Sequence, residues 1–270
     1  MVVSALVDVL VPRRWLVRAL GGRSTLGGAV VGGLAALPAM MCTCCTAPLA
    51  VTMRRAGVPT SAALAFWLGN PVLNPAVLVF LALLVLWPWV AVRVALGLVL
   101  VIGVSTLLGG LAARRSTRLP AADRAVTAAL AGPGPELTAA QIPGRLLRSF
   151  LRLALVLVPE YLVVVFLIGL VGAPLGRALG HGGAVAVLVA AAGGLLLVLP
   201  TGGEIPILLG LAAAGASAGV LGALLLVLPA LSLPSMVIVG RALTWRVTLA
   251  AAGATAVVGV LAGGLLTVVS

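Results

Sequence analysis

The sequence predicts an all-α integral membrane protein, a polytopic helical bundle of two homologous repeats whose helices are broken near their centres. Three observations predict this fold class. Hydrophobic residues make up 63% of the 270 residues and charged residues 8%, with a mean hydropathy of +1.31, a composition suited to lipid. Apolar stretches of about 20 residues, the length that crosses a bilayer, recur along the chain. Proline, glycine and tryptophan recur at one fixed spacing, which indicates an internal repeat.

The apolar segments that could cross the bilayer follow a shorter apolar run at residues 2–11. That run is interrupted by Asp8 and is too short to span. Because Arg13 and Arg14 follow the run instead of preceding it, it does not read as a secretory signal. We expect about seven to eight transmembrane segments, the first of them truncated. The complete segments are placed at 25–53, 60–87, 89–112, 147–171, 182–211, 218–243 and 247–268.

A polar stretch at 113–146 divides the chain into two membrane repeats. It holds the densest group of charges together with several prolines and glycines, which is typical of a linker. The first repeat is therefore expected at 1–112 and the second at 147–270. Positive charge accumulates in the cytoplasmic loops of membrane proteins. The linker is accordingly expected on the cytoplasmic side.

An offset of 158 residues aligns the two repeats without gaps over their most distinctive part. Leucine and alanine match by chance in apolar chains, so the proline, glycine and tryptophan pairs carry the argument. The helix at 147–171 then corresponds to one that would begin before residue 1, so the leading helix of the first repeat is expected to be cut short. Complete halves would have four crossings each, and an even number favours halves of the same orientation. The matched pairs are Pro48 with Pro206, Gly57 with Gly215, Ala65 with Ala223, Pro71 with Pro229, Leu73 with Leu231, and Trp87 with Trp245.

The strongly basic balance does not indicate a nucleic-acid partner. The formal net charge is +12 and all 17 basic residues are arginine, but they lie mainly at segment ends, where membrane proteins place positive charge. The chain has no lysine and an excess of Ala, Gly, Val and Leu, which is typical of a bacterial genome of high GC content. We therefore expect a multi-pass protein of the bacterial inner membrane, with the lipid bilayer as its partner and no nucleic acid.

No motif for nucleotide chemistry is present, since the sequence lacks G-x-x-x-x-G-K-[ST]. We expect neither enzyme activity nor a cofactor. Active transport by this chain would have to draw on an ion gradient or on an ATPase from another chain.

Four of the apolar segments carry helix-breaking residues near their centres, within 42–48, 70–75, 200–206 and 229–234. Broken backbone is tolerated in a bilayer only where protein or a water-filled cavity covers it. One proline kink is usually structural, whereas paired broken helices in two halves mark the solute site of a transporter. The expected breakers are Pro48, Pro71, Pro75, Pro206, Pro229 and Pro234.

The whole cysteine content lies in the first of these breaks, at Cys42, Cys44 and Cys45. A lone cysteine in such a helix would be a small buried hydrophobe, but clustered thiols suggest contact with a soft or thiol-reactive solute. No second cluster completes a closed site, so no metal is expected beyond transient contacts with these thiols. A redox relay to a thioredoxin-like or other membrane partner is the alternative. It ranks second because exchange commonly uses a C-x-x-C pair, whereas the run reads C-x-C-C and the second half has no cysteine.

Glu204 is the most informative charge, because it falls in the break of its segment. An ionisable side chain at the bilayer centre costs about 3 kcal/mol to insert, so it is a functional hypothesis by default. A carboxyl group there could take and release protons, which predicts proton coupling; the alternative is a protonated glutamate that only ties down unwound backbone. Glu160 is a weaker candidate for the same role. Asn70, Asn74 and Ser232 are assigned to solute binding, with bonding of freed backbone as the structural alternative.

These motifs resemble those of the bacterial predicted-permease family that includes the organoarsenical efflux permeases (ArsP-like permeases). The resemblance rests on the Cys-x-Cys run with Pro48, on Gly57 and on the Asn-Pro pairs of 70–75, and it continues at 200–206 and 229–235. It covers essentially the whole chain. It implies a permease of two repeated halves, and some members export trivalent organic arsenicals through thiol contacts. The chain departs from the pattern in that Cys45 and a threonine follow the Cys-x-Cys, and in its short leading helix.

The sequence thus predicts a membrane permease that moves a small solute, with coupling to an ion gradient. A soft or thiol-reactive metalloid species, such as a trivalent organoarsenical, is the candidate substrate. The alternatives are a membrane thiol-redox protein and a non-transporting membrane scaffold.

Overall fold

The computed structural model describes four ranges of the chain and a few single residues. The ranges are 24–55, 57–116, 183–195 and 202–269, and the single residues are 151, 155, 159, 166, 197 and 199. Within them the protein is helical and has no strand. Most of the segment expected at 147–171, most of the linker at 113–146 and the leading run before residue 24 lie outside this description.

Three helices in the described ranges are long and apolar enough to cross a membrane, and a bent pair makes a fourth candidate. The first is the continuous path Thr60–Leu84 through α5 (Thr60–Val72) and α6 (Pro75–Leu84). The second, Trp87–Arg114, passes through α7 (Trp87–Leu98), the π-helical η2 (Val99–Val104) and α8 (Ser105–Ser116). The third is α15 (Trp245–Val269), and the bent pair is α13 (Ala218–Ala230) with α14 (Leu233–Ala242), at an angle of 44°.

The segments expected at 25–53 and 182–211 are not single spans. The first contains α3 (Thr25–Ala36) and α4 (Thr43–Arg55), and the second contains α11 (Gly183–Gly194) and α12 (Glu204–Ala213). These helices have 10 to 13 residues, so at about 1.5 Å per residue they are shorter than the hydrocarbon core of about 30 Å. A 3-10 turn, η1 (Leu37–Ala39), ends α3, and the left-handed Met40 after it, with φ 45°, redirects the chain.

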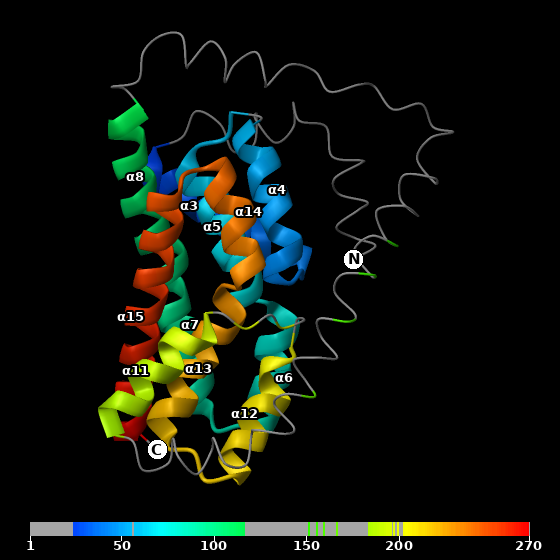
Figure 1. Cartoon of the computed structure of the whole chain (residues 1–270), viewed down its shortest axis with the longest axis vertical. Helices are drawn as coiled ribbons and strands as arrows, with labels where there is room; N and C mark the ends of the chain where they lie inside the picture. Colours follow the sequence, from blue (N-terminus) through cyan, green and yellow to red (C-terminus); the bar gives the residue numbers. More distant parts are fainter. Residues whose placement is uncertain are drawn as a thin grey trace.

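Helices α3 and α4 form a hairpin that begins and ends on one side of the bundle. Gly28 of α3 lies against Ser61 of α5, and Gly33 lies against Gly69, so α3 and α5 run in the same direction. Helix α4 connects the end of α3 with the start of α5 and therefore returns to the side on which α3 began (Figure 1).

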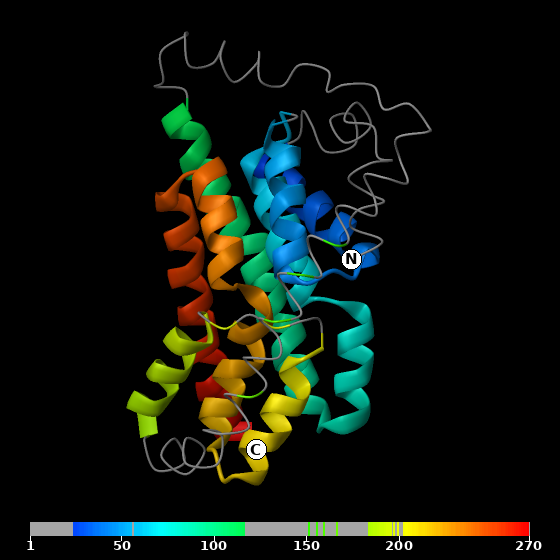
Figure 2. The ribbon, with the colours of Figure 1, turned by 45° about the vertical axis from the view of Figure 1, so that its right-hand side comes forward.

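The second half contains the same hairpin at the opposite end of the bundle. Gly219 of α13 lies against Val187 of α11, and Gly194 of α11 lies against Val227, so these two helices also run in the same direction. In both views α3, α4, α5 and α14 occupy the upper part, whereas α6, α11, α12 and α13 occupy the lower part (Figures 1 and 2).

Helices that the 158-residue offset pairs run in opposite directions. The helix from α7 to α8 runs from the bottom to the top of Figure 1, whereas α15 runs from the top to the C-terminus at the bottom. Within the described ranges the paired helices are thus inverted, which differs from the same orientation expected from an even number of crossings. In each half, two short helices take the place of one continuous helix that the sequence predicted.

The ends of the paired helices agree with the offset. Helix α3 pairs with α11, α5 with α13 and α6 with α14, each with the same length and with both ends 158 residues apart. Gly57 and Gly215 follow α4 and α12 in the same left-handed conformation, with φ 89° and 90°, which glycine adopts without steric cost. This agreement is what an internal repeat predicts.

Helices α13 and α15 pack closely through small residues. A Cβ atom placed on Gly263 would lie 2.4 Å from the carbonyl oxygen of Gly219, and one on Gly222 would lie 2.9 Å from that of Ala262. Small residues allow helix backbones to approach in a membrane, where association depends on packing because lipid is as apolar as the side chains.

Gly263→Ala is therefore expected to lower the stability of the protein, by roughly 1–3 kcal/mol for overpacking. Gly264 is the matched control, because it is exposed, neighbours Gly263 on the same helix, and has no atom within 4 Å of an added Cβ. Gly264→Ala should be neutral or stabilising, since alanine favours a helix by about 1 kcal/mol over glycine. Thermal unfolding in detergent measures both, and equal melting temperatures would contradict this close packing.

Candidate functional site

The path through α5 and α6 and the bent pair of α13 and α14 are both interrupted where the sequence predicts breaks. Helix α5 ends at Val72 and α6 begins at Pro75, so the break lies inside the predicted 70–75. Helix α13 ends at Ala230 and α14 begins at Leu233, inside the predicted 229–234. In both cases the carbonyl groups at the end of the first helix lose their regular partners, which must be replaced inside a membrane.

The six expected breaker prolines occupy two kinds of position. Pro75, Pro206 and Pro234 lie in the first turns of α6, α12 and α14, where the missing N–H group of proline is tolerated. Pro48, Pro71 and Pro229 instead lie inside α4, α5 and α13. The first break, between η1 and α4, therefore includes Cys42 and does not lie at Pro48. A proline removes one backbone bond, and a membrane helix can continue past it because neighbouring groups satisfy the freed carbonyl.

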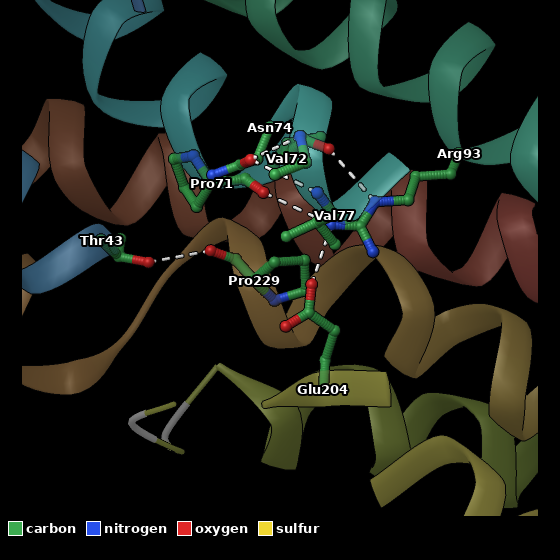
Figure 3. A network of polar contacts seen from close by, with 9 residues as sticks. Thr43, Pro71, Val72, Asn74, Val77, Arg93, Glu204 and Pro229 are labelled. Atoms are coloured by element: carbon green, nitrogen blue, oxygen red, sulfur yellow. Dashed lines mark hydrogen bonds and ion pairs between the residues drawn. The ribbon is translucent and has the colours of Figure 1, made fainter. Parts of the chain in front are cut away.

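A buried ion pair joins the two halves at the centre of the bundle. Arg93 of α7 donates from Nη2 to Oε1 of Glu204, the first residue of α12, at 2.9 Å, and the side chains are 0% and 2% exposed. Arg93 also donates from Nε to the Val72 carbonyl at 3.1 Å and from Nη2 to the Pro71 carbonyl at 3.3 Å (Figure 3). The helical partner of the Pro71 carbonyl would be Pro75, which has no N–H group. The guanidinium therefore replaces a backbone donor at the break as well as pairing with the carboxylate.

Arg93 was not among the predicted site residues. It lies near the start of the expected segment 89–112, where an arginine would normally extend to the membrane interface. Charge balance is the signal that could have identified Arg93. This arginine lies inside the apolar span Trp87–Arg114, and an intramembrane carboxylate such as Glu204 needs a charged partner.

Asn70 and Asn74 bind backbone at the same break. The Asn70 Oδ1 atom accepts from the Met41 N–H at 2.6 Å, and the Asn74 Oδ1 atom accepts from the N–H groups of Ala76 and Val77 at 3.1 and 3.4 Å. Asn74 thereby caps α6. Both side chains are fully buried. Backbone bonding, the structural alternative for these two residues, is therefore observed for one atom of each amide.

Three donors around this break have no hydrogen-bond partner among the residues that the structure describes: Arg93 Nη1, Asn70 Nδ2 and Asn74 Nδ2. A buried donor without a partner costs about 1–3 kcal/mol. The break thus keeps a surplus of donors after its backbone is satisfied.

The cysteines lie at the start of α4 and in its first turn. The sulfur atoms of Cys42 and Cys45 are 3.2 Å apart, whereas the Cys44 sulfur lies 3.6 Å from the Ser232 hydroxyl oxygen of the other half. Thr43 between them donates to the Pro229 carbonyl at 2.8 Å. In the described ranges no three His, Cys, Asp or Glu side chains converge on a position that could hold a metal ion. The three thiols are therefore divided between a close pair and a contact across the halves.

Cys42 and Cys45 have the spacing C-x-x-C, which is contained in the same run that reads C-x-C-C. One turn of backbone brings their sulfur atoms together. Thiol exchange was ranked second partly because such a pair was thought to be absent, and that reason does not hold. The other reason, the lack of a cysteine in the second half, still holds.

The remaining predicted residues are less informative. Ser232 lies in the α13–α14 break, where its backbone N–H donates to the Ser235 hydroxyl at 3.2 Å. Glu160 and Pro200 fall outside the residues that the structure describes.

Four short helices begin at the centre of the bundle. They are α4, α6, α12 and α14, and in Figure 1 their first residues lie between the upper and lower groups of helices. The Thr43–Pro229 and Cys44–Ser232 contacts connect the start of α4 with the break before α14. The Arg93–Glu204 pair connects the break before α6 with the start of α12. Each helix start carries a partial positive charge of roughly +0.5.

An all-helical, apolar bundle with broken helices around a buried polar centre defines a membrane transporter. The chain belongs to the ArsP-like predicted-permease family: the model described as "Predicted permease" matches residues 1–268. This confirms the family membership that the motifs predicted. A similar protein is the UPF0718 protein YraQ of Escherichia coli (strain K12), which is 36% identical over 267 residues, 98% of this chain and 74% of that relative. No solved structure matches the chain.

Proposed function

We propose that the protein is a secondary permease of the bacterial inner membrane whose two halves are inverted repeats, with a small solute crossing between them at the central breaks. The observation that carries the proposal is the Arg93–Glu204 pair, which places one charge from each half at the point where the broken helices meet. Charged groups inside a membrane mark solute and ion pathways. Inverted repeats with discontinuous helices place the solute site at their interface.

The polar contacts between the halves suit a structure that rocks open. Besides the ion pair, they include the Thr43 bond to the Pro229 carbonyl and the Cys44–Ser232 contact. Alternating access moves one repeat against the other around a central site. A few polar contacts at the centre can be exchanged for solute or water during that motion.

The Cys42–Cys45 pair supports a soft solute. Two sulfur atoms 3.2 Å apart can bind one metalloid centre together after small side-chain rotations, and thiolates prefer soft partners. A trivalent organoarsenical, bound by both sulfurs, remains the candidate substrate.

Glu204 is proposed as the coupling residue. A proton on its carboxylate would remove the charge that Arg93 balances and would weaken the contact between α7 and α12. Protonation from one side of the membrane and release to the other would thus link the proton gradient to the rocking of the halves.

Transport into everted membrane vesicles, driven by a proton gradient and measured with a trivalent phenylarsenical, tests the proposal. We expect accumulation by the parent and at least a tenfold lower rate for Glu204→Gln and for the triple Cys→Ser variant. Thr267→Ser, an exposed change near the end of α15, should transport like the parent. If both site variants also transport like the parent, the assigned site is wrong.

The Cys42–Cys45 distance also favours a second function, a thiol-redox protein that exchanges with a thioredoxin-like partner. In that reaction the two thiols would form one disulfide, and the partner's disulfide would take up the two electrons and two protons. Alkylation trapping in cells separates the two functions, because only a redox carrier should hold a populated disulfide that depends on the partner. A scaffold would keep its function when Glu204 and the cysteines are replaced together.

A further inference from the structure

We infer that the centre of the bundle binds a small oxyanion through Arg93, Asn70 and Asn74, and that the Glu204 carboxylate competes with this anion for Arg93. The inference names the chemical class of a solute and therefore rests on the proposed permease. It concerns a different part of the centre from the thiols.

The first support is that the unsatisfied groups at the α5–α6 break are all donors. Arg93, Asn70 and Asn74 are fully buried, and each has a nitrogen without a partner. The two amides cannot turn around, because each Oδ1 atom already accepts from a backbone N–H and reversal would set donor against donor. The break therefore presents N–H groups and calls for an acceptor, which an oxyanion supplies and a metal cation does not.

The second support is the local charge. Helices α4, α6, α12 and α14 all begin at the centre, and helix N-termini attract anions. Glu204 is the only acidic residue in the described ranges, and Arg93 balances it. The partial charges of the helix starts are left over, so the centre as a whole is positive.

The third support is the geometry of the guanidinium. Its Nε and Nη2 atoms are engaged by the Val72 and Pro71 carbonyls and by Glu204, which leaves only Nη1 for a ligand (Figure 3). Two-point binding of an oxyanion by arginine needs two of these donors. Full engagement of the anion therefore requires release of the Glu204 carboxylate.

This competition makes anion binding depend on the charge of the Glu204 side chain. The described helices packed around α12 are α6, α7 and α13, and Arg93 is the only charged side chain that they carry. Replacing the Glu204 carboxylate with a neutral amide removes the competing charge, so the anion should bind more tightly to Glu204→Gln than to the parent.

The test is saturable binding of sulfate and nitrate to the purified full-length protein in non-ionic detergent, measured by calorimetry at constant pH and ionic strength. Both anions are fully charged at neutral pH, and the detergent excludes anionic lipid headgroups as the source. We expect the parent to bind both anions. Glu204→Gln should bind them at least tenfold more tightly than the parent.

The double variant Arg93→Gln/Glu204→Gln keeps the local charge balance and should show no saturable binding. Arg241→Gln, which removes an exposed arginine of α14, should bind like the parent. Water could occupy the donors instead, in which case neither the parent nor Glu204→Gln binds either anion. That result, or binding that survives in the double variant, overturns the inference.

Transport of radiolabelled sulfate in vesicles separates this inference from the proposed function. Anion binding by a protein that transports neither sulfate nor the arsenical probe would uphold the anion site and contradict the permease. Transport of the arsenical probe by a protein that binds no oxyanion would uphold the permease and contradict the anion site.

Discussion

Replacing Arg93 with methionine should destabilise the protein more than any other single change at the centre. Methionine fills a similar volume but leaves the Glu204 carboxylate, 2% exposed, without its ion-pair partner. Removing one partner of a buried pair costs about 3–5 kcal/mol, and the Pro71 and Val72 carbonyls also lose their donor. The yield of monodisperse protein and its melting temperature in detergent, against Arg241→Met as the exposed control, measure the effect.

The double variant Arg93→Met/Glu204→Met should recover much of that stability. Apolar replacement of a whole buried ion pair is often neutral or stabilising, although the two carbonyls still need a donor. Transport should remain absent in the recovered protein, because the charges that the permease uses are gone. If the double variant is as unstable as the single one, the role of Arg93 is to hold the α5–α6 break rather than to balance Glu204.

Local chemistry in the sequence was enough to place two of the four expected breaks. The Asn-Pro pairs at 70–75 and the prolines at 229–234 cannot continue a regular helix, and the chain breaks inside both ranges. Glu204 was singled out because a carboxylate is costly in an apolar segment, and its side chain is buried at the centre.

The direction of the halves could not be predicted in the same way. A 29-residue apolar stretch such as 25–53 has the composition of one spanning helix and equally of two half-length helices. The difference arises from packing: Gly28 and Gly33 fit against Ser61 and Gly69 of α5, which fixes α3 alongside that helix. Contacts of this kind depend on tertiary structure.

The partners at the centre were hidden for a similar reason. Arg93 and Glu204 are 111 residues apart, and no local pattern joins them. The contact of Cys44 with Ser232 spans 188 residues. A sequence can therefore indicate which residues need partners, while the fold decides which partners they receive.

A disulfide between the halves should form readily and stop transport. In a Cys42→Ala/Cys45→Ala background, Ser232→Cys would place a second thiol beside Cys44, since the sulfur and the present hydroxyl oxygen are 3.6 Å apart. A disulfide bond needs about 2.05 Å between sulfurs, which small side-chain and backbone shifts can provide. Mild oxidation is expected to link the two halves. To detect the link, a protease site is inserted at 113–146 and cleaved, and the linked halves then run as one band on a non-reducing gel.

The same disulfide should reduce transport at least tenfold, measured with a solute that the cysteine-depleted background still transports. Reductant should restore transport, because the rocking motion must separate the start of α4 from the break before α14. Exchanging the two residues, Cys44→Ser with Ser232→Cys, gives the matched control with a single cysteine, which should neither cross-link nor lose transport on oxidation. A failure to cross-link would place the two breaks further apart than 3.6 Å suggests. A complete cross-link with unchanged transport would show that the solute passes without separation of these breaks, and the rocking of two inverted halves would have to be abandoned.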